Sequence, residues 1–225
     1  MNNRIPPQEI FRTVHLRKFY PQTQSSAVED VSLKITTGEF VGIKGPSGSG
    51  KSTLLYLLAG LIEPTSGEIY FSDKALKDIP NKALYRRENL GFMFQDFYLY
   101  PHFTVLENML FPLLHRMVIQ KEIIQKAEKH LDYLNISGKK DMPVEVLSAG
   151  ERQRVCIARA LLHDPKCILA DEPTGNLDSK NAKNILDLLQ KINRETGTTI
   201  LLVTHDEQVS NYAHRLINIV DGKLK

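Results

Sequence analysis

The chain has 225 residues and 42% of them are apolar, which is enough for a substantial folded core. Its 29 basic and 26 acidic side chains are spread along the sequence and leave a formal charge of +3, so no concentrated basic field is available to grip a nucleic-acid backbone. We therefore expect no nucleic-acid partner. No run reaches the roughly 18 apolar residues of a membrane-spanning helix, and the first ten residues lack the apolar segment of a secretory signal.

The two cysteines, Cys156 and Cys167, both lie in apolar stretches of the sequence. This placement is typical of small buried side chains in a reducing compartment and not of a disulfide framework.

The N-terminal part of the chain alternates strand and helix patterns. After a short N-terminal tail, an apolar run over 40–44 leads into a glycine-rich loop and then a leucine-rich helix, which is the order strand, loop, helix. The full set of elements predicted here is strands over 10–20, 27–35, 40–44, 67–71 and from 90 to Gln95, with a short helix over 81–88.

The pattern becomes helical from about residue 96 to 163, where apolar residues recur at helical spacing. After it, 167–170 and 198–204 are continuous apolar runs separated by an amphipathic helix, the pattern of parallel strands buried on both faces. A strand over 215–220 and an Asp-Gly turn close the chain. We therefore predict one domain over 1–225, with an α/β core of residues 10–95 and 164–225 and a helical subdomain inserted at about 96–163.

Residues 45–53 read GPSGSGKST and satisfy the pattern GxxxxGK(S/T) between a strand and a helix. Glycines let successive backbone N–H groups converge on phosphate oxygens, and the start of the helix adds the positive end of its dipole. Lys51 is expected to neutralise the charges of the β- and γ-phosphates of a bound nucleotide. Ser52 is the expected Mg²⁺ ligand. The predicted nucleotide contacts in this stretch are Gly45, Pro46, Ser47, Gly48, Ser49, Gly50, Lys51, Ser52 and Thr53.

Polar side chains also end three of the later strands. Asp171 and Glu172 follow a buried run, at the edge of an open α/β sheet where ligands bind; Asp171 is expected to hold Mg²⁺ through water and Glu172 to polarise the attacking water. A helix cap is the alternative for this pair. His205 is expected to contact the γ-phosphate and orient that water, although a lone histidine is often structural. Gln95 is expected to bond water or Mg²⁺ through its amide, with an ordinary loop residue as the alternative.

The stretch LSAGERQRV, residues 147–155, opens a helix expected to run to about 163. Ser148 and Gly150 would form a second anion-binding helix N-terminus, and a single nucleotide does not need two. We therefore predict that two protomers sandwich each ATP, the glycine loop of one facing the turn of the other through Ser148, Ala149, Gly150 and Glu151. A serine cap of a basic amphipathic helix is the alternative.

Taken in order, these motifs resemble the ATP-binding subunit of ABC transporters over nearly the whole chain. GPSGSGKST is similar to Walker A, Gln95 to the Q-loop, CILADE to Walker B, GNLD at 175–178 to the D-loop and His205 to the switch histidine. LSAGE is similar to the signature LSGGQ but departs from it by an alanine and a glutamate. Tyr20 resembles the aromatic residue that stacks on adenine, with Phe19 as the alternative.

The resemblance implies a P-loop NTPase core, a RecA-like sheet plus an antiparallel β subdomain, with an inserted α-helical signature subdomain. It implies hydrolysis of ATP with Mg²⁺, dimerisation with a second ATP-binding subunit, and docking of a membrane permease near Phe97–Phe103 at the cytoplasmic face of the inner or plasma membrane. Phe92 and Phe94, in the preceding strand, are expected in the core.

The phrases QDFYLYPHFTVLEN and DEPTGNLD resemble the branch that holds lipoprotein-release, macrolide-export, antimicrobial-peptide-resistance and cell-division ATPases. That branch implies export or extraction as the function. One alternative is a regulatory ATPase that moves a membrane partner without transport. Another is a DNA-repair or ribosome-associated ATPase, for which a coiled-coil insertion or tandem cassette is expected.

Overall fold

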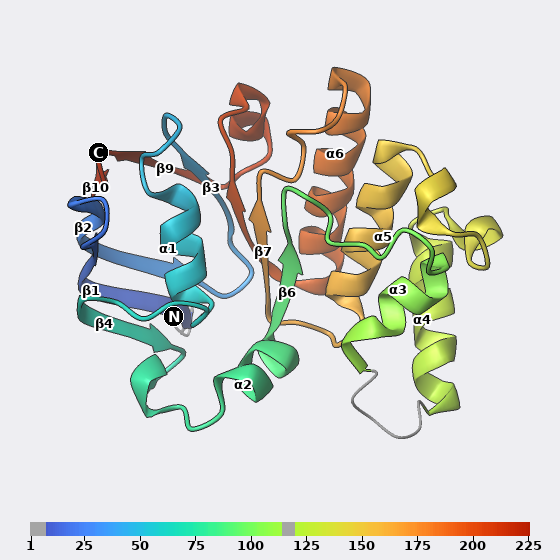
Figure 1. Ribbon diagram of the computed structural model, residues 1–225, viewed down its shortest axis with the longest axis horizontal. Helices are drawn as coiled ribbons and strands as arrows, with labels where there is room; N and C mark the ends of the chain where they lie inside the picture. Colours follow the sequence, from blue (N-terminus) through green and yellow to red (C-terminus); the bar gives the residue numbers. More distant parts are fainter. Residues whose placement is uncertain (1–7, 114–119) are drawn as a thin grey trace, which may run out of the picture.

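The computed structural model describes residues 8–113 and 120–225. Most of the expected N-terminal tail, and residues 114–119 of the expected helical segment, lie outside these ranges. The described chain forms two sheets, with one group of helices gathered at the end opposite the N-terminal sheet (Figure 1).

The first sheet is antiparallel, with the strand order β2-β1-β4-β5. In β2 the residues Val31, Leu33 and Ile35 are buried at every second position, so one face of this strand packs on the core as the alternation predicts. The strands are β1 (Glu9–Tyr20), β2 (Ser25–Thr36), β4 (Ser66–Phe71) and β5 (Lys74–Ala75).

The second sheet has the order β10-β9-β3-β8-β7-β6, and only its edge pair β9–β10 is antiparallel. Every residue of β7 and β8 is buried, which explains their continuous apolar sequences. The strands are β3 (Phe40–Lys44), β6 (Leu90–Met93), β7 (Cys167–Asp171), β8 (Thr199–Val203), β9 (Arg215–Val220) and β10 (Lys223–Leu224). Because β6 ends at Met93, the prediction of a strand reaching Gln95 was wrong, and Gln95 lies in the loop beyond.

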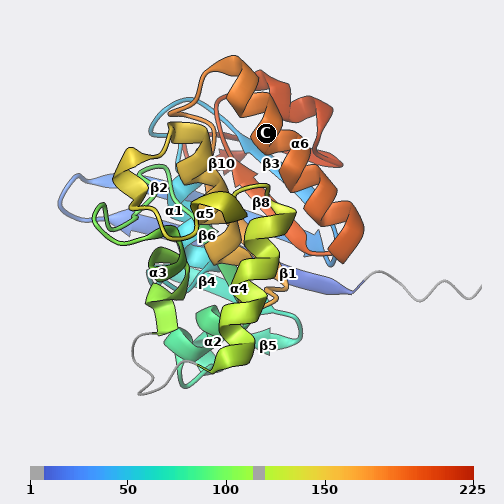
Figure 2. The same ribbon diagram turned by 90° about the vertical axis from the view of Figure 1, so that its right-hand side faces the viewer.

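Six α-helices are present in the described chain. Figure 2 shows α3, α4, α5 and α6 on one side of the parallel sheet. Their bounds are α1 (Lys51–Leu58), α2 (Lys82–Asn89), α3 (Val105–Leu110), α4 (Lys121–Tyr133), α5 (Ala149–Leu161) and α6 (Ser179–Thr196). Helix α5 ends at Leu161, two residues before the expected end, and a turn at Leu162–His163 leads the chain towards β7.

Two apolar clusters use opposite faces of the parallel strands. In β7, Ile168 and Ala170 join α3–α6 in one cluster, whereas Cys167 and Leu169 face α1 and the antiparallel sheet in the other. Helix α1 is therefore held between the two sheets, and the loop before it is fixed at the carboxyl ends of the parallel strands.

Cys156 and Cys167 are both buried and free, as the sequence predicts. Burial raises the pKa of both thiols, that of Cys156 to about 12, so neither is a thiolate at neutral pH. Over residues 8–113 and 120–225, no helix combines the length and apolar character needed to cross a bilayer.

A buried asparagine fixes the chain between β6 and α3. The side chain of Asn108, 0% exposed, accepts a hydrogen bond from the Tyr100 N–H at 2.7 Å and donates to the carbonyls of Tyr100, Phe103 and Thr104. These bonds satisfy backbone groups that the loop conformation leaves unpaired. The loop that contains Gln95 is thus held to α3 at its C-terminal side, through Tyr100.

Candidate nucleotide-binding site

The glycine loop, residues 45–50, connects β3 to α1 and is packed against neighbouring backbone. A Cβ added at Gly45 would lie 2.0 Å from the Ile219 carbonyl oxygen, and one added at Gly50 would lie 1.8 Å from that of Ala27. Gly50 also has φ 100°, a left-handed conformation that favours glycine. The glycines therefore let the loop pass close to β2 and β9, so that its backbone is exposed at the sheet edge.

Lys51 opens α1 and is only 6% exposed. Its Nζ donates to the carbonyl oxygens of Gly45 and Pro46, each at 2.9 Å, so the ammonium lies inside the loop. Among the described residues the buried hydroxyl of Ser49 has no hydrogen-bond partner. A buried ammonium and a buried unpaired hydroxyl beside a turn of backbone N–H groups form a donor set that suits phosphate oxygens.

Asp171 lies at the end of β7 directly across from the first turn of α1. Its Oδ1 accepts a hydrogen bond from the Ser52 hydroxyl at 2.8 Å and its Oδ2 accepts one from the Tyr56 hydroxyl at 2.9 Å. Burial, and then the hydrogen bond to Asp171, raise the pKa of Tyr56 to about 12, so this hydroxyl remains a donor at neutral pH. The carboxylate, 5% exposed, is thus held by both oxygens.

Sequence reasoning missed Tyr56. A signal was present, because Tyr56 follows Ser52 by four positions and therefore lies on the same face of α1. It is a polar hydroxyl within the run LLYLL, where a buried hydroxyl requires a partner.

Glu172 follows Asp171 in a left-handed backbone conformation, φ 47°, and its N–H donates to the Val203 carbonyl at the end of β8. Such strain in a non-glycine residue is typical of functional sites. Its Oε2 lies 2.9 Å from Nδ1 of His205 and accepts a hydrogen bond from the Thr204 hydroxyl at 3.3 Å. The Glu172 side chain is 13% exposed and that of His205 72% exposed, so the pair lies at the rim of the sheet edge.

Gln95 is exposed in the loop after β6, and its backbone carbonyl accepts a hydrogen bond from the Asn176 side chain at 2.9 Å. A Cβ added at Gly175 would lie 3.9 Å from the Gln95 Nε2 and 3.8 Å from the Glu172 Cβ. The segment 175–176 therefore lies between Gln95 and Glu172. The bond from Asn176 was not predicted from the sequence.

The signature turn, residues 148–151, is the capped start of α5. The Glu151 carboxylate accepts from the Ser148 N–H at 2.9 Å and from its hydroxyl at 2.8 Å, and the Ser148 oxygen accepts from the Glu151 N–H. Lys139 also pairs with Glu151. Its ammonium, followed by the donors of Ser148, lowers the pKa of Glu151 to about 2. The serine cap that was the alternative interpretation is thus present, and it leaves first-turn N–H groups at the helix end.

The signature turn is separated from the glycine loop within one chain. Figure 1 shows the starts of α1 and α5 on opposite sides of β6 and β7. A Cβ added at Gly150 would approach the Asn181 side chain on α6 at 3.1 Å. The fold thus brings together the glycine loop, Asp171, Glu172 and His205, with Gln95 beside them, and places residues 148–151 elsewhere.

Tyr20 is the last residue of β1 and is half-buried, with the Lys18 ammonium 5.3 Å from its ring centroid. It pairs with Ser25 in the β1–β2 register, two residues before the Ala27 that touches the glycine loop. Phe19 is also half-buried and bonds Thr65 through its N–H. The two aromatic residues thus lie at the end of the first sheet beside the loop.

Replacing Tyr56 with phenylalanine is expected to lower the free energy of unfolding by about 1–3 kcal/mol, because the buried Asp171 carboxylate loses a hydrogen bond. Urea unfolding followed by circular dichroism measures the change. Tyr70→Phe, which removes a hydroxyl bonded to Glu68 at the surface, serves as the control and should cost less. Equal losses in the two variants would contradict a special role for the Tyr56 bond.

At Glu151, substitution by glutamine should preserve the helix cap, whereas Glu151→Ala should cost about 1 kcal/mol, because only glutamine keeps an oxygen that accepts from the Ser148 N–H. The contribution of the carboxylate is present above its ordinary pKa of 4.5 and is lost as the pH falls through about 2. Denaturation curves of both variants at neutral pH test the cap. If alanine is as stable as glutamine, the cap contributes nothing.

Comparison with known proteins places these features in a family. The family model described as ABC transporter matches residues 28–175, which is more than half of the chain. A "Lipoprotein-releasing system ATP-binding protein LolD 1" of Chlorobium chlorochromatii (strain CaD3) is 43% identical over 224 residues, covering 97% of this chain and 91% of the relative. A "Lipoprotein-releasing system ATP-binding protein LolD" of Bordetella avium (strain 197N) is 40% identical over 221 residues, covering 96% of each.

Solved structures agree with this assignment. The chain is similar to the ATP-binding cassette MJ0796, described as a dimer in a post-hydrolysis state bound to ADP and Pi, with a TM-score of 0.85, 38% identity and 96% of each chain covered. It is also similar to cbiO1 of Clostridium perfringens, part of the ABC transporter complex cbiONQ, with a TM-score of 0.87, 30% identity, and 97% and 87% of the chains covered. The predicted P-loop NTPase fold is therefore confirmed, and the chain belongs to the ABC transporter family as an ATP-binding cassette.

Proposed function

We propose that this chain is an ATP-hydrolysing subunit that dimerises around two Mg-ATP and powers a separate membrane permease. The observation that carries the proposal is the separation of two anion-binding surfaces on one chain: the glycine loop at the start of α1 and the signature turn at the start of α5. Two copies arranged head to tail bring one surface of each kind to each nucleotide. Only the ATP-bound pair satisfies both, so ATP favours the closed state.

The similar proteins support the dimer and the direction of transport. MJ0796 is described as dimeric in two structures, one of them with ADP and Pi, and the two LolD relatives are named as parts of lipoprotein-releasing systems. An export or extraction function follows for this chain by likeness. In this role it would be a peripheral protein at the cytoplasmic face of the inner or plasma membrane, attached through the permease.

The oxygen donors beside the glycine loop fit Mg²⁺, which prefers carboxylate, hydroxyl and water ligands. Ser52 and Asp171 already lie within hydrogen-bond distance of each other, and the Gln95 amide would complete the set. Bound Mg²⁺ would neutralise charge on the β and γ phosphates. If Ser52 bound the metal in place of Asp171, the Tyr56 hydroxyl would still donate to the other carboxylate oxygen of Asp171.

Glu172 is the residue we assign to activate the attacking water. Thr204 and His205 hold one of its carboxylate oxygens, which fixes the plane of the group at the sheet edge. His205, largely exposed, can contact both Glu172 and a γ-phosphate above the glycine loop. Lys51 would exchange its two loop carbonyls for phosphate oxygens, and the donors of Ser49 and the loop N–H groups would hold the remaining charge.

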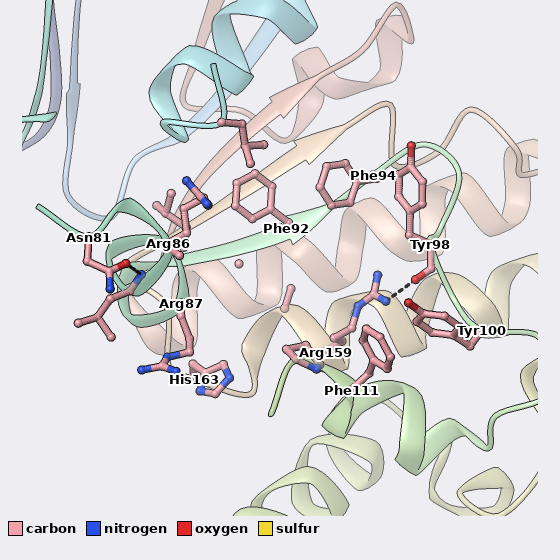
Figure 3. Close-up of a pocket in the computed structure, with 17 residues that line it drawn as sticks. Asn81, Arg86, Arg87, Phe92, Phe94, Tyr98, Tyr100, Phe111, Arg159 and His163 are labelled. Atoms are coloured by element: carbon pink, nitrogen blue, oxygen red, sulfur yellow. Dashed lines mark hydrogen bonds between the residues drawn. The ribbon is translucent and has the colours of Figure 1, made fainter. Parts of the chain in front are cut away.

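The permease is proposed to dock in an apolar groove. The groove has a volume of about 830 Å³ between α2, β6 and α5 (Figure 3). We call it the docking groove; its lining includes Leu61, Leu84, Phe92, Phe94, Tyr98, Tyr100, Phe111 and Arg159. Phe92 and Phe94 are partly buried and their rings stack at 5.4 Å. Phe92 packs against the apolar cluster around α1, so the expected core position holds in part for Phe92, and both rings also line the groove.

The exposed aromatic side chains of this groove come from the chain after Gln95. Tyr98 is 62% exposed and Tyr100 is 44% exposed, and Tyr100 lies 4.1 Å from Phe111 between ring centroids. Apolar surface of this kind, rimmed by arginines, is typical of protein interaction sites. The loop therefore joins the nucleotide site on one side to the docking groove on the other.

Glu172→Gln is expected to slow ATP hydrolysis by about 10²–10⁴-fold, because the amide is a poor base, and to trap an ATP-bound dimer. In this background, Ser47→Cys and Ala149→Cys chains are prepared separately, mixed and oxidised. A disulfide between the two should form only with ATP. The native cysteines are buried and do not interfere.

Lys51→Ala in the same mixture is the control, and it should abolish both nucleotide binding and the crosslink. Bound ATP without a crosslink would overturn the head-to-tail dimer. Hydrolysis at the parental rate by Glu172→Gln would overturn the choice of base while leaving the dimer intact.

Replacing Tyr98 and Tyr100 together with alanine should uncouple transport from hydrolysis. Removal of two central aromatic anchors weakens docking by roughly tenfold or more, so permease-dependent transport in proteoliposomes should fall far more than hydrolysis by the chain alone. Leu216→Ala, at another exposed apolar residue, is the matched control. Parallel loss of both activities in the tyrosine variant would count against the groove.

A further inference from the structure

The Gln95 loop, residues 94–100, contains two consecutive residues in a conformation that side chains disfavour. Phe97 has φ 49° and Tyr98 has φ 45°, and neither is glycine or asparagine. Strain of this kind persists only where surrounding contacts compensate for it. Asn108 anchors the loop at Tyr100, so the strained pair itself requires another support.

Helix α5 supplies that support from one stripe of its surface. Arg159 donates to the Phe97 carbonyl and to the Tyr98 carbonyl, each at 2.6 Å, and the Cys156 thiol lies 3.4 Å from the Phe97 carbonyl. The Arg152 guanidinium stands 5.7 Å from the centroid of the Phe97 ring. Residues 152, 156 and 159 follow the spacing i, i+4, i+7, so one helix face makes all of these contacts.

The geometry of the arginine matches the strained conformation. In an extended strand successive carbonyls point to opposite sides, whereas in a left-handed turn, as in any helical conformation, they point roughly the same way. The N–H groups of a single planar guanidinium can therefore donate to both carbonyls in the conformation that this pair has, whereas an extended loop would turn one of the carbonyls away. Figure 3 shows the bond from Arg159 to the Tyr98 carbonyl among the residues that line the docking groove, with the Tyr98 ring beside Phe94.

The same helix begins at the signature turn. Ser148 is the N-cap of α5 and accepts a hydrogen bond from the Glu151 N–H, and Arg159 lies in the last turn, so one helix reaches from the proposed partner nucleotide to the Gln95 loop. Arg154, on another face of α5, instead donates to the Leu134 carbonyl next to α4 at 2.9 Å. The contacts described here with the loop that carries Tyr98 and Tyr100 come from the stripe with Arg159.

We propose that Arg159 is a positioning residue: by bonding the carbonyls of Phe97 and Tyr98 it fixes the Gln95 loop to α5, so that engagement of the signature turn by ATP is transmitted to the docking groove. This inference rests on the proposed function for the meaning of the groove. The two hydrogen bonds from Arg159 to the Phe97 and Tyr98 carbonyls lie within a single chain, so their effect on the loop can be tested without a permease.

The test is hydrogen–deuterium exchange of the full chain carrying Glu172→Gln, with and without Mg-ATP. We follow three peptides, covering residues 45–53, 96–103 and 147–155. The added variants are Arg159→Ala, Arg159→Lys and, as the matched control from the same helix, Arg154→Ala.

We expect ATP to slow exchange in all three peptides of the parent. In Arg159→Ala, exchange in 96–103 without nucleotide should be about tenfold faster, and its response to ATP should be lost while 45–53 and 147–155 still respond. In Arg159→Lys, whose ammonium lacks the planar fork of the guanidinium, exchange in 96–103 should be intermediate between the parent and Arg159→Ala, and exchange in Arg154→Ala should match the parent.

Unchanged exchange in 96–103 of Arg159→Ala would show that Arg159 does not fix the loop. An intact ATP response in that peptide would show that Arg159 does not transmit ATP binding to the groove. A loss of protection throughout Arg159→Ala, or the same local loss in Arg154→Ala, would show a general packing role and would also overturn the proposal. Failure of the proposed function is distinguishable, because then ATP would leave 147–155 of the parent unchanged while the nucleotide-free difference at 96–103 would remain.

Discussion

The hydrogen bond from Ser52 to Asp171 ties together the two ends of the nucleotide site. Ser52 lies at the start of α1 and Asp171 at the end of β7, segments that are 119 residues apart in sequence. The bond exists because β3 and β7 run parallel on either side of β8 and end at the same edge of the sheet. Displacing α1 from its place between the two sheets would separate the loop, the proposed metal ligands and the water-activating residue at once.

Helix α5, unlike α1, does not start at the glycine loop. It packs with α3, α4 and α6 in the apolar cluster on the other face of the parallel sheet, and its hydrogen bonds to the Gln95 loop connect it to the nucleotide site. The chain therefore carries the glycine loop and the signature turn at the starts of two helices that pack against opposite faces of the parallel sheet. In the proposed dimer this arrangement allows the signature turn to contact the ATP of the other copy while the glycine loop binds the ATP of its own chain.

Much of the fold followed from sequence because its strongest signals are local. The continuous apolar runs of β7 and β8 predicted buried parallel strands, and the glycine loop between strand and helix predicted the phosphate site with its helix start. Boundaries were less accurate. The strand before Gln95 ends at Met93, since the backbone there leaves the sheet to form a turn stabilised by α5 and Asn108, residues distant in sequence.

The parts of the site that sequence did not predict all depend on contacts between distant segments. Tyr56 shares a helix face with Ser52, but the sequence does not show that β7 places Asp171 against that face. Nor does it show that the loop after β6 passes beside Asn176. Phe97 and Tyr98 have no local signal for left-handed backbone, because glycine or asparagine would be expected there. The hydrogen bonds from Arg159 compensate for the strain of these two residues, and they come from a helix that starts about fifty residues later in the chain. No local sequence pattern predicts these bonds.

The ion pair of Glu151 with Lys139 bears on how two copies attract each other. In the proposed dimer, a lone carboxylate at the signature turn would repel the triphosphate bound by the opposing subunit, and the Lys139 ammonium offsets that charge. The pair thus carries no net charge. Removing the lysine alone would leave a negative charge facing phosphate and shorten the lifetime of the closed pair, most strongly in dilute salt.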